Sequence, residues 1–212
     1  TMSVVLCQCA GYGRIDPEKI EAVRSACSDA GIPCLTVPDL CYLAARDPES
    51  ARHMADADLI LACQTRALRA LFPGATRCLD LRTEPVETVV AAIRATPATP
   101  IVCDPKPQEG WIPWFPVIDR TRCVQCKKCV DFCLFGVYAA ANGAVTVSQP
   151  DHCKTDCPAC ARICPQNAII FPKSEEPRLN GALDVPVKPL PMDQEAFRER
   201  LKHRKLRLFK ED

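Results

Sequence analysis

The sequence predicts an α/β fold, a parallel sheet wrapped by helices, followed by a smaller cysteine-rich unit and a basic C-terminal helix. From Met2 to about Asp104, short apolar runs alternate with helical patterns, which is typical of a parallel sheet covered by helices. The chain holds 16 cysteines in 212 residues, and half of them fall between Cys123 and Cys164. A chain of this length can hold two modest cores, and we expect two.

The five expected strands share a continuous apolar composition, which indicates that helices cover both faces of the sheet. They are SVVLC (3–7), PCLTV (33–37), ADLILAC (57–63), TRCLDL (76–81) and PIVCD (100–104). The first helix has clear ends, because Asp16 can cap it, Pro17 suits its first turn and Gly31 stops it. A later helix follows LDLRTEP and begins at Val86. These elements predict a Rossmann-like domain over residues 2–104.

Two proline-rich segments flank the cysteine-rich unit. Residues 105–116, PKPQEGWIPWFP, are predicted to be a linker that packs, because their three aromatic side chains would otherwise leave an apolar patch in water. Residues 173–212 are predicted to form a proline-rich extension and one strongly basic amphipathic helix over 193–210. That helix either packs on its own domain or docks on an acidic partner subunit, and the sequence leaves both open. Its narrow apolar face disfavours membrane association.

Eight cysteines form two runs with close, regular spacing. CVQCKKCVDFC separates its cysteines by two, two and three residues, and CKTDCPACARICP by three, two and three. Tight turns between close thiolates let three sulfurs converge on one iron–sulfur cubane while the fourth points away. Zinc sites instead pair their ligands across a longer loop, often with histidine, and no histidine stands at ligand spacing here. The doubled motif therefore predicts iron–sulfur clusters in a small domain that the metal stabilises.

These runs resemble those of the bacterial ferredoxins that carry two 4Fe–4S clusters, over about residues 117–172. The resemblance implies a small α+β domain in which the fourth cysteine of each run binds the cluster of the other run. It assigns Cys123, Cys126, Cys129 and Cys164 to the first cluster. It assigns Cys153, Cys157, Cys160 and Cys133 to the second. Leu134 replaces the usual proline and the second run has one extra residue, so the two clusters are expected to differ in potential.

The other eight cysteines divide by position. Four lie inside predicted elements and are interpreted as small buried residues, namely Cys27, Cys34, Cys78 and Cys103. Four lie at strand ends or just beyond them, namely Cys7, Cys9, Cys41 and Cys63. Because the carboxyl ends of parallel strands lie at one edge of a sheet, this second group can meet there.

The first strand ending in C-x-C-x-G, the single cysteine after the second strand and the segment ADLILACQTRALRALF resemble the N-terminal module of the heterodisulfide reductase A subunit. The resemblance covers about residues 2–75 and implies a third 4Fe–4S cluster, bound by Cys7, Cys9, Cys41 and Cys63. Cys78 is the substitute ligand should Cys7 face into the sheet. Gly11 and Gly13 are expected to let backbone amides approach the sulfurs. The flavin of that family is not expected, because no strand is followed by GxGxxG.

Composition narrows the remaining function classes. The net charge of +1 gives no general attraction to nucleic acid or to an anionic membrane. No apolar run is long enough to cross a bilayer, and residues 1–30 lack the pattern of a signal peptide, so we expect a cytoplasmic protein with reduced thiols. No set of serine, histidine and carboxylate indicates hydrolysis, and we assign no catalytic residue.

The sequence therefore predicts an electron-transfer protein or subunit, a polyferredoxin of anaerobic metabolism that relays single electrons to or from a larger redox enzyme. One alternative is a catalytic subunit of a reductase whose N-terminal cluster acts on a thiol, disulfide or acyl substrate. The other is an iron–sulfur redox sensor whose basic helix binds nucleic acid. The lack of a recognisable DNA-reading motif disfavours the sensor.

Overall fold

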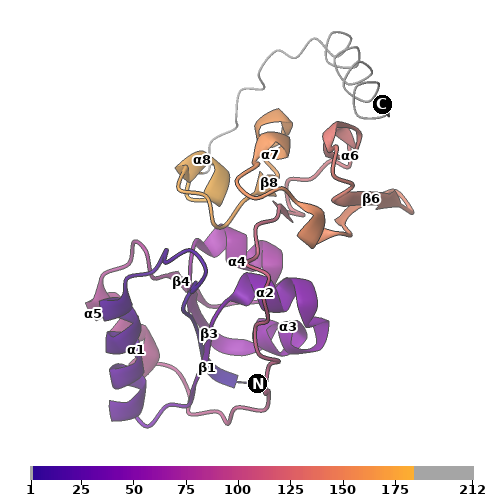
Figure 1. Cartoon of the computed structure of the whole chain (residues 1–212). Helices are drawn as coiled ribbons and strands as arrows, with labels where there is room; N and C mark the ends of the chain where they lie inside the picture. The colour runs from indigo at the N-terminus through magenta and orange to yellow at the C-terminus, as the bar shows by residue number, and fades with distance from the viewer. Residues whose placement is uncertain (1, 184–212) are drawn as a thin grey trace.

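The first half of the chain is built on a four-stranded parallel sheet, shown in Figure 1. The computed structural model describes residues 2–183. The strand order is β2-β1-β3-β4. The strands are β1 (Met2–Cys7), β2 (Cys34–Val37), β3 (Ala57–Ala62) and β4 (Cys78–Asp80). All pairings are parallel, so the four carboxyl ends share one edge, as the sequence predicts for an α/β fold.

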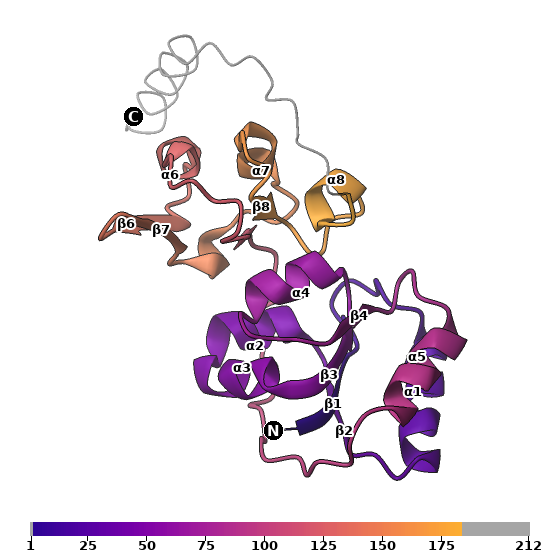
Figure 2. The same cartoon turned by 180° about the vertical axis from the view of Figure 1, so that it is seen from behind.

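Helices cover both faces of this sheet. Helices α1 (Pro17–Asp29) and α5 (Val86–Arg94) lie together on one face, while α2 (Leu40–Arg46) and α3 (Pro48–Ala55) lie on the other, as Figures 1 and 2 show. Helix α4 (Thr65–Leu71) lies between the sheet and the cysteine-rich half in both views. Because both faces are covered, Val5, Leu6 and Ile60 are fully buried.

The first helix forms for the local reasons that the sequence supplies. The Asp16 side chain accepts a hydrogen bond from the Glu18 amide, Pro17 occupies the first turn, and the chain turns at Gly31 with a φ of 65°. The predicted ends of this helix are confirmed.

The fifth predicted strand is wrong. Residues 101–104 have no regular structure, and the Ile101 and Val102 side chains are exposed. Pro97, Pro100 and Pro105 surround this short apolar run and remove backbone donors that a sheet ladder needs. The Ser3 hydroxyl on β1 instead donates to the Pro97 carbonyl at 2.9 Å and accepts from the Thr99 amide, which fixes the preceding loop against the first strand.

The cysteine-rich half contains two small antiparallel pairs and short helices. Strand β5 (Val117–Ile118) pairs with β8 (Ile169–Ile170), and β6 (Tyr138–Ala141) pairs with β7 (Ala144–Val147). The helical segments are α6 (Lys128–Phe132), a 3-10 turn η1 (Pro150–His152), α7 (Ala159–Ile163) and α8 (Pro177–Asn180). Asn142 and Gly143 both have positive φ, which suits the tight turn between β6 and β7.

The two halves are held together by an apolar contact that includes the predicted linker. Trp114 stacks on Phe171 with ring centroids 5.4 Å apart, and it also contacts Tyr12 of the first half at 5.8 Å. Phe115 packs in a separate small core with Ala67 of α4 and Val117 of β5. The segment therefore packs as expected, although the domain boundaries at 104, 116 and 172 remain predictions.

Two further expectations concern the ends and the membrane. The predicted basic helix over 193–210 lies outside the described residues. Within residues 2–183, no helix combines the length and the apolar character needed to cross a bilayer.

Candidate metal centres

Four cysteines of the second half line one pocket. Cys123, Cys126, Cys129 and Cys164 surround it, and its walls include the apolar side chains of Ile118, Val145 and Ile169. Burial, followed by the proximity of Cys164 and Cys126, raises the pKa of the Cys129 thiol to about 11. The structure thus brings together in one pocket the four thiols that the resemblance assigns to the first cluster, including Cys164 from the second run.

The second group of four thiols also converges. Burial raises the pKa of the Cys153 thiol to about 12, with added contributions from nearby Cys157 and Cys133. Cys160 lies near the same three sulfurs. The buried Tyr138 hydroxyl donates a hydrogen bond to the Cys160 sulfur at 3.0 Å. Cys133 therefore lies close to cysteines of the second run.

The loops that carry these thiols have an unusual backbone. Gln125, Lys127 and Asp156 are non-glycine residues with φ of 56°, 62° and 58°. Each of them stands directly before or between cysteines of a run. Left-handed residues in such loops turn successive amides toward one side, which is how backbone concavities bind anions and iron–sulfur groups.

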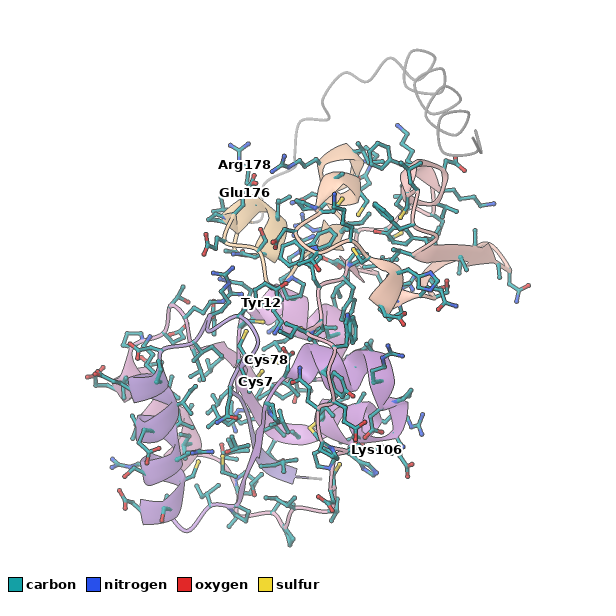
Figure 3. The ribbon with its side chains drawn as sticks, in the orientation of Figure 1. Cys7, Tyr12, Cys78, Lys106, Glu176 and Arg178 are labelled. Carbon is teal, nitrogen blue, oxygen red and sulfur yellow. The ribbon has the colours of Figure 1, made fainter. Side chains whose placement is uncertain are left out.

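A third group of thiols lies at the carboxyl edge of the parallel sheet. Cys7 ends β1, Cys9 follows it, Cys41 is in the first turn of α2 and Cys63 comes directly after β3. All four are buried. Figure 3 shows Cys7 inside the first half and Tyr12 on the turn that faces the cysteine-rich half.

The electrostatic neighbours of these thiols show that they are close to one another. Burial raises the pKa of Cys41 well above its ordinary value, and both Cys63 and Cys7 contribute to the shift. Cys9 is likewise a neighbour of Cys7 and of Cys63. The Leu40 amide at the start of α2 donates to the Cys7 sulfur at 3.4 Å. Cys7 therefore faces the group rather than the interior of the sheet.

A buried lysine from the second half reaches this group. The Lys173 ammonium donates to the Cys9 sulfur at 3.2 Å and pairs with the Asp39 carboxylate. Its side chain is 4% exposed and that of Asp39 is 0% exposed. Burial alone would lower the pKa of Lys173, but Cys41, Asp39 and Cys9 outweigh it and raise that pKa. Sequence reasoning missed both charged residues.

Arg82 is a second cation beside this edge, and its side chain is partly buried. It follows β4, and its Nη2 donates to the Pro172 carbonyl at 2.9 Å. Burial raises the pKa of Cys63, while the adjacent Arg82 guanidinium acts in the opposite direction. The Arg82 Nε is buried and has no hydrogen-bond partner among the described residues. A donor of this kind fits an anionic group at the site.

The glycine-containing turn after β1 is expected to bring backbone amides to the sulfurs, but its hydrogen bonds go elsewhere. The amides of Tyr12 and Gly13 donate to the Cys9 carbonyl, not to a sulfur, at 3.1 and 2.9 Å. Gly11 is needed because a Cβ there would come within 2.5 Å of the Ile112 side chain in the linker. Cys9 itself has a φ of 50°, so it shares the left-handed conformation of the other cysteine loops.

Comparison with known proteins gives two relatives, both from Methanocaldococcus jannaschii. A protein described as an uncharacterised ferredoxin is 50% identical over 70 residues, which are 32% of this chain and 48% of the relative. Subunit PorD of pyruvate synthase is 34% identical over 67 residues, which are 31% of this chain and 76% of that subunit. The chain belongs to the ferredoxin family. It spans about half the length of the first relative, and no family model matches it.

The two matches support a ferredoxin-like iron–sulfur domain in this chain. The resemblance of the first half to heterodisulfide reductase remains an expectation from its own residues. Within residues 2–183, no three histidine, cysteine or acidic side chains converge on a point as ligands of a single ion do. A cubane does not require this, because each of its irons takes one cysteine.

The four remaining cysteines differ in how far they are buried. Cys27 and Cys78 are buried as expected, and Cys78 lies near Cys63. Cys34 and Cys103 are only partly buried, which corrects the expectation for both. Cys103 lies outside the sheet because its predicted strand does not form. Phe135, which follows the first cysteine run, is 42% exposed, whereas Tyr138 is buried.

Proposed function

We propose that this ferredoxin is a three-cluster electron-transfer protein that relays single electrons to or from a larger redox enzyme. The observation that carries the proposal is the gathering of twelve thiols from distant parts of the sequence into three groups of four. When bound, each 4Fe–4S cluster supplies a one-electron carrier held by four thiolates.

The ligand sets of the ferredoxin half follow the pocket and the neighbours described above. Cys123, Cys126, Cys129 and Cys164 bind one cluster, and Cys153, Cys157, Cys160 and Cys133 bind the other. Support comes from the shared pocket of the first set and the mutual proximity of the second. The donor set is all sulfur, which is the set that iron–sulfur clusters require.

The third ligand set is Cys7, Cys9, Cys41 and Cys63. Two observations support it besides their proximity. Lys173 donates to the Cys9 sulfur and Arg82 lies beside the Cys63 sulfur, and cations in these positions suit a centre that carries negative charge. The left-handed Cys9 resembles the backbone of the other two sites.

The partner is proposed to be an oxidoreductase subunit. One relative, PorD, is by its name a subunit of pyruvate synthase, and this supports an assembly of the same general kind. The predicted basic helix over 193–210 is the proposed docking segment. A partner that binds it through charge is acidic, so the association weakens as salt is raised.

Iron and acid-labile sulfide analysis of anaerobically purified protein tests the number of clusters. Three clusters need about twelve iron atoms per chain, and two need about eight. Cys41→Ser should lower the iron content to about eight and remove one spectroscopic signal, leaving two unchanged. Cys34→Ser is the matched control, because Cys34 lies on β2 outside the three groups. About eight iron atoms in the unaltered, fully loaded chain would contradict the third centre.

A further inference from the structure

We propose that Lys173 sets the reduction potential of the N-terminal cluster, as a hydrogen-bond donor to its ligand Cys9 and as a buried counter-charge. The inference rests on the proposed third centre. It assigns to a residue of the second half a role in a site whose ligands all come from the first half.

The geometry places the ammonium beside the thiol group. Lys173 Nζ lies 3.2 Å from the Cys9 sulfur, and Cys41 and Cys7 are also among the residues that act on its charge. The side chain is almost fully buried, so water screens its charge very little. A charge in this position acts on every electron that enters or leaves the cluster.

The backbone of Lys173 is held firmly from the first half. The Arg14 Nε donates to the Lys173 carbonyl at 3.0 Å, and the Arg82 Nη2 donates to the preceding Pro172 carbonyl at 2.9 Å. Two arginines thus fix the strand end that delivers the ammonium. Fixed geometry of this kind is what a tuning residue needs, because a mobile lysine would reorient when the charge of the centre changes.

The sign of the effect follows from charge. One-electron reduction adds one negative charge to the centre and forms or breaks no bond. A positively charged hydrogen-bond donor at the Cys9 sulfur stabilises the reduced state of the cluster and therefore raises its reduction potential. The Asp39 carboxylate, paired with Lys173, opposes it. Removing the cation should lower the potential, and removing the carboxylate should raise it.

The test uses the full chain, purified without oxygen and titrated with dithionite while electron paramagnetic resonance follows each cluster. Lys173→Met should lower the midpoint of the third signal, and Asp39→Asn should raise it. The asparagine keeps the oxygen that accepts from the Cys41 amide at 2.8 Å, so the first turn of α2 stays capped. Lys19→Met is the control, because Lys19 bonds the Leu81 and Glu84 carbonyls and no cysteine. The two ferredoxin signals should not shift in any variant.

The possible outcomes test the third centre and the role of Lys173 separately. Eight iron atoms and two signals in the unaltered chain would overturn the third centre itself. Three signals with an unchanged third midpoint in Lys173→Met would overturn only the role of Lys173. If Lys173→Met loses the third cluster, the test rests on Asp39→Asn. An unshifted midpoint potential of the third signal in Asp39→Asn then rejects the inference.

Discussion

The Arg66 guanidinium bonds through Nε to the Asp119 carboxylate at 2.8 Å, joining helix α4 of the first half to the loop after β5. Arg66 also donates to the Asn167 carbonyl. Both partners of the ion pair are mostly buried, with side chains 16% and 10% exposed. This pair is therefore a principal polar link between the halves.

Replacing Arg66 with Met should loosen that link, because it leaves Asp119 without its closest cation in a mostly buried position. Breaking a pair of this kind costs about 3 kcal/mol, or roughly a 100-fold increase in the open population. Chymotryptic cleavage beside Trp111 in the linker should accelerate accordingly. Arg162→Met is the control, since its pair with Glu176 is exposed and its loss should have little effect. Equal cleavage rates in the two variants would show that the link is not needed.

Tyr138→Phe should lower the midpoint potential of one ferredoxin cluster. The change removes the hydroxyl that donates to the Cys160 sulfur, and such hydrogen bonds favour the reduced state. Burial raises the pKa of Tyr138, so the phenol stays protonated and able to donate at neutral pH. A redox titration of the two ferredoxin signals measures the shift. Tyr42→Phe, whose hydroxyl only accepts from the Glu109 amide, should leave both signals in place.

Removal of iron should unfold the ferredoxin half and spare the sheet. The core of the second half is small, and several of the proposed ligands pack against it, so the clusters supply much of its stability. After chelation and oxidation, trypsin should cut quickly within residues 117–172, while the larger core of the first half stays resistant. A second half that remains as resistant as before would refute the dependence on metal.

Asp47→Ala should destabilise the first half by about 1 kcal/mol, because Asp47 caps α3 through the Ser50 amide at 3.2 Å. The hydrogen bond from the Ser50 hydroxyl lowers the pKa of Asp47. A lowered carboxyl pKa gives stability that is complete above the unfolded value and is lost as pH falls through the folded one. The difference in unfolding free energy between the unaltered protein and Asp47→Ala should therefore be constant from pH 5 to 8. Thermal unfolding followed by circular dichroism measures it, and exposed Glu49→Ala should show no such loss.

The parts of this fold that follow from local chemistry could be predicted from the sequence. Asp16 and Pro17 mark the start of α1, and continuous apolar runs mark four parallel strands. The run at 100–104 has the same apolar composition, but it forms no strand because its flanking prolines lack the backbone N–H groups that pairing in a sheet needs. The β6–β7 hairpin was also predictable, because Asn142-Gly143 is a strong turn signal between two short strand patterns.

The candidate sites, like the fold, could be predicted only where the sequence signal is local. Cysteine spacing is local, so the two runs can be recognised without a structure, and the resemblance to two-cluster ferredoxins supplies their grouping into ligand sets. Lys173 has no local signal, because its relation to Cys9 and Asp39 arises only when the two halves pack. A lysine after the apolar run AIIFP is the one hint that the sequence offers, since a cation directly after a buried strand needs a partner.

The contact between Lys173 and Cys9 spans 164 positions of the chain. At a synthesis rate of 5–20 residues per second, roughly ten to thirty seconds pass between the appearance of the cysteine and that of the lysine. During this interval the sheet of the nascent chain can already fold, with its carboxyl edge open to the surroundings. An iron–sulfur carrier would have access to those four thiols before translation ends and much poorer access afterwards. Delivery of a cluster to the proposed third centre would therefore be easiest while the chain is still being synthesised.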